Sequence, residues 1–229
     1  MSLILNIDTS TETANVCIAE DGKLLASISN PHQKDHAAFL HNAINDIIQK
    51  SSLKLNSLSA IAVTNGPGSY TGLRVGMASA KGLCYALNKP LITVGSLEVM
   101  AKTVIAAAPQ NEPALYCPLI DARRMEVYTA LYNSQMKEVF TPKALILNES
   151  SFEEILNTQK IYFFGSGAAK FEPIITNKNA FFLSIEGSMF SMSYLSFERF
   201  FSGKYTDLVD SEPLYIKDFH LSPDFSNKK

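Results

Sequence analysis

Several features that would narrow the class of this protein at once are missing or scarce. Among its 229 residues there is no tryptophan, cysteine occurs three times and histidine four times, and the formal net charge is only −2. Lysine and arginine are not clustered, so the sequence shows no footprint for direct binding of a polyanion, and we expect a partner to hold any nucleic acid. No apolar run approaches the ~20 residues of a membrane span, and the start has no signal-peptide pattern, so we expect a cytoplasmic protein.

The cysteines are too few and too scattered to form a disulfide framework or a zinc site. Cys17, Cys84 and Cys117 lie far apart, and each stands in an apolar stretch such as NVCIA or LYCPL. This pattern is typical of buried free thiols in a reducing compartment.

The histidines are equally uninformative about a metal. His32 and His36 lie four residues apart, but Gln33 stands where the zinc-protease motif H-E-x-x-H has its glutamate. The pair therefore does not favour a zinc site. His41 and His220 have no obvious ligand partners in the sequence.

The pattern that is present indicates an α/β protein. With 46% hydrophobic and 18% charged residues, the chain can bury a sizeable core as one large domain or two small ones. The first half predicts the order β-β-β-α-β-α-β, with Asp21-Gly22 as a hairpin turn, and hence a mixed sheet covered on both faces. The expected strands are 3–8, 15–19, 23–29, 60–64 and 91–94, and the expected helices are 34–50 and 71–88.

The second half repeats this organisation in weaker form. Prolines and polar residues mark a lobe boundary near 106–113, so we expect an N-terminal lobe at 1–106 and a smaller C-terminal lobe at 107–229. A return segment is expected after about residue 203, with a short strand at Leu214–Ile216. The other expected elements are strands at 114–120, 127–132, 144–147 and 160–164 and a short helix from Ser151.

A glycine-rich loop is the most conspicuous motif. The segment IAVTNGPGSYTGLRVG, residues 61–76, runs from an apolar strand through glycines into a helix. Its spacing matches neither the phosphate-binding loop that ends in Gly-Lys-Ser/Thr nor the dinucleotide pattern G-x-G-x-x-G. Free N–H groups at the positive end of a helix dipole can bind an anion, but a tight strand-to-helix turn also explains the glycines.

An acidic residue lies at the end of the first expected strand. Asp8 is followed by three hydroxyl side chains in Thr9-Ser10-Thr11, a setting that can hold a metal-phosphate complex or simply cap a loop. Both interpretations remain open. The candidate anion or nucleotide site consists of Asp8, Ser10, Gly66, Gly68 and Ser69.

Small residues continue through the helix that follows the loop. Gly72, Gly76 and Ala80 recur every four residues, and a neighbouring stripe contains Ala78, Gly82 and Ala86. Each glycine inside a helix costs ~1 kcal/mol relative to alanine. The simplest compensation is close approach of another backbone, either from the helix 34–50 or from a second protein chain.

A charged segment lies between two expected strands of the second half. Asp121, Arg123 and Arg124 can bind phosphate or the acidic surface of a partner, or they can form a solvated hairpin tip with internal ion pairs. The sequence contains no G-x-S-x-G nucleophile motif.

Taken together, these segments resemble the TsaB (YeaZ) family, the bacterial partner subunit in making threonylcarbamoyladenosine on tRNA. The resemblance is dense through residue 132 and sparse beyond it, and it implies an actin-like, Hsp70-like ATPase (ASKHA) fold with two ribonuclease-H-like lobes. The matching segments are LILNIDTSTETANVCIAEDGKL, LSAIAVTNGPGSYTGLRVGMASAKGLCYAL, PLITVGSLEVMA, IDARRMEVYTALY and EPLYIK.

The resemblance also implies that this chain is not the catalyst. The related catalytic subunit TsaD has two metal-binding histidines four residues apart, downstream of a similar glycine segment. Ser96 and Met100 occupy those positions here. Neither side chain suits a hard catalytic metal, so the resemblance predicts no metal site and no cofactor of its own, with ATP and Mg²⁺ used by the complex.

The family's partners imply a binding surface. By resemblance we expect a heterodimer with TsaD, recruitment of the ATPase TsaE, a homodimer when the chain is alone, and tRNA bound through the complex. The expected interface residues on the helices 34–50 and 71–88 are His36, Phe39, Leu40, Ala43, Ile47, Gly72, Arg74, Val75, Gly76, Ser79, Ala80 and Leu83. Two alternatives are an ATP- and Mg²⁺-dependent enzyme of the same fold, which would use Asp8 and the glycine loop, and, less favoured, a metallopeptidase.

Overall fold

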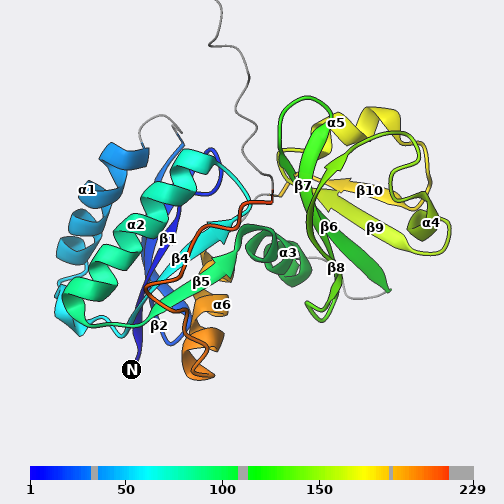
Figure 1. Ribbon diagram of the computed structural model, residues 1–229. Helices are drawn as coiled ribbons and strands as arrows, with labels where there is room; N and C mark the ends of the chain where they lie inside the picture. Colours follow the sequence, from blue (N-terminus) through cyan, green and yellow to red (C-terminus); the bar gives the residue numbers. More distant parts are fainter. Residues whose placement is uncertain (32–35, 108–112, 186–187, 217–229) are drawn as a thin grey trace, which may run out of the picture.

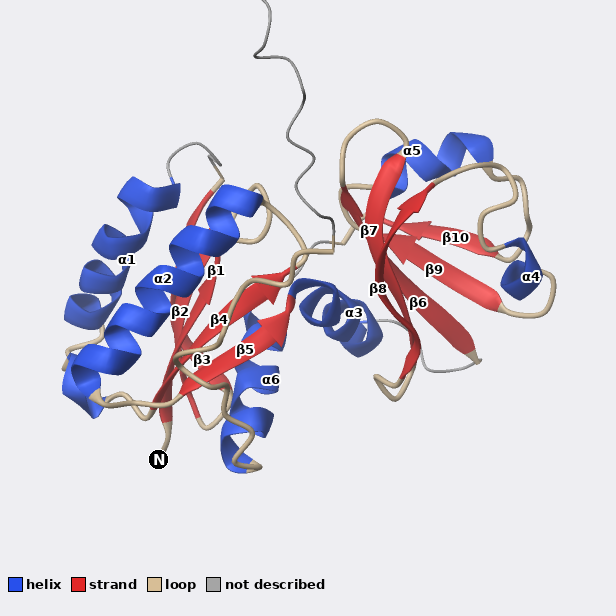
Figure 2. Cartoon of the chain, viewed as in Figure 1, coloured by secondary structure: helices blue, strands red, loops and turns tan. Residues whose placement is uncertain are grey.

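The computed structural model describes residues 1–31, 36–107, 113–185 and 188–216 of the protein (Figure 1). Two lobes lie side by side, each built on a five-stranded sheet, and the helix α3 (Ser96–Ala107) lies between them (Figure 2). Among the described helices, none has both the length and the apolar character of a membrane span.

The first sheet has the strand order β3-β2-β1-β4-β5. Strands β1 and β2 pair antiparallel, β2 and β3 continue the meander, and β4 and β5 add parallel to β1. The meander and the two parallel strands are confirmed. The strands are β1 (Leu3–Asp8), β2 (Ala14–Glu20), β3 (Lys23–Asn30), β4 (Ala60–Gly66) and β5 (Leu91–Gly95).

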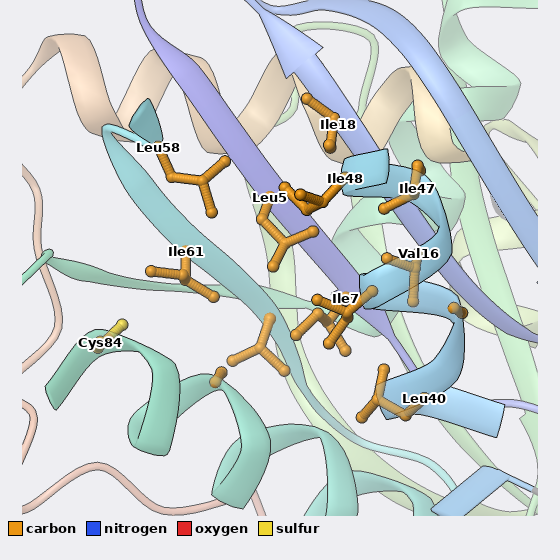
Figure 3. Close-up of a cluster of buried hydrophobic side chains, with 14 of the residues drawn as sticks. Leu5, Ile7, Val16, Ile18, Leu40, Ile47, Ile48, Leu58, Ile61 and Cys84 are labelled. Atoms are coloured by element: carbon orange, nitrogen blue, oxygen red, sulfur yellow. The ribbon is translucent and has the colours of Figure 1, made fainter. Parts of the chain in front are cut away.

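Helices cover both faces of this sheet because its strands alternate apolar side chains between them. Leu5 and Ile7 of β1 point toward α1 (His36–Lys50) and α2 (Tyr70–Leu87), in the cluster that Figure 3 shows. The neighbouring Ile4 packs in a second cluster with Met192 of α6 (Met189–Phe201) and Val99 of α3. Asn88 ends α2 in the left-handed conformation, which asparagine adopts more readily than most residues with a side chain.

The second sheet repeats the topology of the first. Its order, β10-β9-β6-β7-β8, again has an antiparallel meander, β6-β7-β8, next to parallel strands. This repetition confirms two ribonuclease-H-like lobes. The elements are β6 (Ala114–Asp121), β7 (Glu126–Asn133), β8 (Glu138–Ile146), α4 (Glu153–Leu156), β9 (Lys160–Phe164), α5 (Ala168–Phe171), a 3-10 turn (Glu172–Ile174) and β10 (Ala180–Leu183). In the first lobe, a 3-10 turn (Leu55–Ser57) precedes β4.

The chain returns to the first lobe earlier than expected. Helix α6 packs on β1, β2, β3 and β5, so the return begins with this helix and not after residue 203. The predicted strand at Leu214–Ile216 is wrong, because these residues are irregular. The N–H of Leu214 donates to Asn65 O of β4 (2.6 Å), but no ladder of strand hydrogen bonds forms among the described residues here. The predicted strand at 144–147 is the end of the longer β8. His32 and His220 lie outside the described residues.

The cysteine prediction is confirmed, since Cys17, Cys84 and Cys117 are buried free thiols. Burial raises the pKa of each thiol from 9.0 to about 12.

Because the thiolate is the reactive form, we expect all three cysteines to resist alkylation at pH 8 in the native protein and to react in denaturant. Since the folded pKa exceeds the unfolded one, their contribution to stability is complete below pH 9 and is lost as pH rises toward 12. Mass spectrometry after timed alkylation measures the reaction rate of each thiol. A thiol that reacts equally fast in the native and the denatured protein would contradict the expected resistance to alkylation.

Candidate functional site

The glycine loop is packed against the loop that follows β1. The backbone N–H of Ser69 donates to the carbonyl oxygen of Ser10 (2.7 Å). A Cβ on Gly68 would overlap the same carbonyl. Gly66 has a φ of +113°, where L side chains are strained. Two of these glycines therefore serve the turn itself.

The glycines inside α2 are explained by the same contact. A Cβ on Gly72 would overlap the carbonyl oxygen of Thr9, and one on Gly76 would overlap the Thr9 hydroxyl. That hydroxyl donates to the carbonyl oxygen of Gly72 (2.7 Å). The close approach that we expected from helix 34–50 or from a second chain is thus made by the β1–β2 loop of the same lobe.

Asp8 holds this loop in place. Its Oδ1 accepts hydrogen bonds from the Ser10 N–H (3.0 Å), the Ser10 hydroxyl (2.7 Å) and the Thr64 hydroxyl (2.8 Å). The residue is 9% exposed. At the candidate anion site, Ser10 O already accepts the N–H of Ser69, and the Ser69 hydroxyl accepts the N–H of Gly72 (3.3 Å). This geometry favours the loop-cap interpretation of Asp8.

Half of the predicted interface residues are buried within the chain. Their positions face the sheet, where they fill the core of the first lobe, so this part of the interface prediction is wrong. The buried residues are Leu40, Ala43, Ile47, Gly72, Gly76 and Ala80. Of the others, Phe39, Val75, Ser79 and Leu83 are half-buried and Arg74 is exposed, while the His36 side chain lies outside the described part of the structure.

The second stripe of small residues faces outward. Ala78, Gly82 and Ala86 are exposed on α2, beside Tyr85, whose exposed fraction is 83%. A Cβ on Gly82 would meet no atom within 4 Å. The ~1 kcal/mol that glycine costs at this helical position is therefore not offset by any contact in the described chain. We call Ala78, Gly82, Tyr85 and Ala86 the outer face of α2.

Both flanks of α2 are covered by the chain itself. On one side, the Ser79 hydroxyl lies 3.4 Å from His41 Nε2 of α1. On the other side, Arg74 stacks 4.0 Å from the ring centroid of Tyr70 and donates from Nε to the hydroxyl of Tyr215 (2.9 Å). This leaves the outer face as a bounded strip between α1 and the return segment, which we define as residues 203–216.

The positions of the predicted lost metal ligands are packed between the lobes. Ser96 and Met100 are 3% and 5% exposed, and the Ser96 hydroxyl has no hydrogen-bond partner among the described residues. A Cβ on Gly165 of the second lobe would overlap the methyl of Met100. Within the described residues, no three His, Cys, Asp or Glu side chains are grouped for metal binding.

The charged segment forms the β6–β7 hairpin tip. Asp121 accepts from the N–H of Arg123 (2.6 Å) and forms an ion pair with Lys170 of α5 (2.7 Å). Arg123 and Arg124 are exposed and have φ values of +70° and +48°. The hairpin interpretation holds with one difference, because the ion-pair partner comes from α5 and not from the arginines.

Two lobes with the same strand order, joined through a helix between them, define an α/β protein of the actin-like, Hsp70-like class. The family model described as TsaD, tRNA N6-adenosine threonylcarbamoyltransferase, matches residues 23–204, so within that class the chain belongs to this family.

Curated relatives carry the TsaB name. The chain is 33% identical over 147 residues to "tRNA threonylcarbamoyladenosine biosynthesis protein TsaB" of Bacillus subtilis (strain 168), covering 63% of this chain and 62% of that one. It is 36% identical over 129 residues to the protein of the same name in Escherichia coli (strain K12), covering 56% and 54%. The match therefore spans only about half to three-fifths of these relatives.

A solved structure supports the fold. A Pseudomonas aeruginosa protein described as similar to peptidase YeaZ superposes with a TM-score of 0.81 at 24% identity. The superposition covers 95% of this chain and all of that one. At this identity the likeness shows the fold.

Proposed function

We propose that this protein is a noncatalytic subunit in the bacterial synthesis of threonylcarbamoyladenosine on tRNA. In this proposal it pairs with the metal-binding subunit TsaD, helps to recruit the ATPase TsaE, and forms a homodimer when TsaD is absent. The assembly, located in the cytoplasm, binds the tRNA and uses ATP and Mg²⁺. The names of the TsaB relatives and the TsaD family match support a role in this pathway.

One observation carries the pairing, namely the outer face of α2. Gly82 lies in the second half of the eighteen-residue helix α2, exposed, with open space where a side chain would be. Flanked by Ala78 and Ala86, it makes a smooth strip on which a second helix can approach closely. Half-buried Val75 and Leu83 add apolar surface at its edge. The proposed contact therefore lies on the stripe that contains Gly82 and not on the stripe of Gly72 and Gly76, which the predicted interface included.

A noncatalytic role is supported by the residues at the start of α3. A buried hydroxyl at Ser96 and a thioether at Met100, packed against Gly165, do not offer the ligands that a hard metal requires. If the purified chain alone converted threonylcarbamoyl adenylate and tRNA to product, this part of the proposal would fail.

The pairing is tested by Gly82→Leu. Because the position is open, the variant is expected to fold as the wild type does, while the leucine holds a partner helix away and weakens the heterodimer by at least about 100-fold. Mass in solution is measured for mixtures of each variant with TsaD from the same organism.

The matched control is Ala169→Leu, which adds the same side chain at an exposed helical position of the second lobe. It is expected to pair as the wild type does. A Gly82→Leu protein that still forms the heterodimer at wild-type concentrations would place the contact elsewhere.

A further inference from the structure

A cavity of about 380 Å³ lies between the lobes, beside the edge of β5. Its walls come from β4 and β5, the start of α3, the β7–β8 hairpin, the end of α6 and the return segment. The volume is within the ~300–1,000 Å³ range of small-molecule sites. Asp8 and the charged hairpin tip take no part in its lining, and Gly66 is the one residue of the candidate anion site among the lining residues.

Four charged side chains line this cavity, and two of them neutralise each other. Arg199 donates from Nη2 to Glu98 Oε2 (2.6 Å) and from Nη1 to the carbonyl oxygen of Thr93 (2.8 Å). Both charged side chains are about three-quarters buried. This pair is therefore a fixed, neutral part of the wall.

The other two charges belong to exposed residues. Glu138, on β8, and Lys204, in the return segment, line the cavity from its solvent side and form no ion pair within the described residues. They approach the cavity from different lobes, one acidic and one basic. A small ligand that contacts both side chains with complementary charge carries a cationic group, such as an ammonium, and an anionic group, such as a carboxylate.

A buried phenol adds a fixed donor to the same wall. Tyr132 is 2% exposed and lines the cavity. Burial, followed by the nearby carboxylates of Glu138 and Glu98, raises the pKa of this phenol. It therefore stays protonated at physiological pH and can donate to an oxygen of a ligand.

The return segment holds Lys204 in position. The Thr206 N–H donates to Leu91 O (2.8 Å), and the hydroxyls of Thr206 and Thr93 lie 2.9 Å apart. These bonds fix the segment along the edge of β5, two residues from Lys204. The basic side of the cavity is thus built on an anchored backbone.

We infer that the interlobe cavity binds a small zwitterion of the free α-amino acid class. Its ammonium group lies against Glu138 and its carboxylate against Lys204, with the Tyr132 hydroxyl donating to a ligand oxygen. The apolar side chains of Leu97, Pro142 and Leu214 line the remaining space.

Calorimetric titration of the purified full chain with each standard L-amino acid tests the inference. At least one is expected to bind with a Kd of about 1 mM or lower, and its N-acetyl and carboxamide derivatives at least about tenfold more weakly. Lys204→Met and Glu138→Gln are each expected to weaken binding by about tenfold or more.

Lys178→Met and Glu149→Gln remove the same charges at exposed positions outside the cavity and are expected to leave binding unchanged. The inference is overturned if no amino acid binds at about 10 mM, or if the two cavity variants bind as the controls do. The titration needs no partner subunit, so its result does not depend on the proposed heterodimer.

Discussion

Replacing Gly72 by alanine is expected to lower the free energy of unfolding by about 3 kcal/mol, whereas the same change at Gly82, ten residues along the same helix, is expected to raise it by up to ~1 kcal/mol. The Cβ at residue 72 would overlap the carbonyl oxygen of Thr9, and a backbone atom cannot move aside as a flexible side chain does. The Cβ at residue 82 meets nothing, so only the helix propensity of alanine remains.

Urea unfolding followed by circular dichroism measures both changes. Since the two variants have the same composition and differ only in which side of α2 carries the methyl group, each is the control for the other. If the Gly72→Ala variant has the same urea midpoint as the wild type, the β1–β2 loop is not held against α2.

Phe171→Ala is expected to cost about 3–5 kcal/mol of stability, the largest effect that we predict for a single side chain. Phe171 is fully buried in the second lobe, and its ring centroid lies 5.0 Å from that of Phe163, 5.8 Å from that of Phe152 and 6.0 Å from that of Phe182. Removing the ring leaves a cavity among neighbours that are themselves locked by aromatic contacts.

The matched control for this variant is Phe190→Ala. Phe190 lies on α6 with 68% of its surface exposed, so its truncation is expected to change stability by no more than about 0.5 kcal/mol. The same urea titration compares the two. Equal losses from the two variants would show that the aromatic cluster does not stabilise the second lobe.

Sequence patterns predicted the elements of the first sheet well, because its strands are short apolar runs separated by turn residues. They did not predict α3, whose sequence SLEVMAKTVIAA is apolar almost all round. Most of its side chains are buried against both sheets, and Glu98, Lys102 and Thr103 form only a narrow polar side, so the helical period is weak. Helix α6 was missed because serine and aromatic residues, which are weak helix formers, make up most of it.

The packing of α2 at the candidate site could not be predicted from the sequence for a different reason. Both small-residue stripes of α2 are visible in the sequence, but residues without bulky side chains do not reveal which stripe faces the sheet. The answer depends on the position of Thr9 and Ser10, more than fifty residues earlier in the chain. The cavity could not be predicted either, because Tyr132, Glu138 and Lys204 come together only when the two lobes and the return segment are in place.

The return of α6 to the first lobe has a consequence for the order in which a ribosome releases a foldable chain. The second sheet is encoded without interruption from β6 to β10, while one face of the first sheet is covered only by α3 until α6 has been made. Domains usually fold in the order of their synthesis, with the amino-terminal one first. Here the amino-terminal lobe is completed after the second sheet, and Ile4, Cys17 and Ile92 remain without their α6 contacts until α6 has left the exit tunnel.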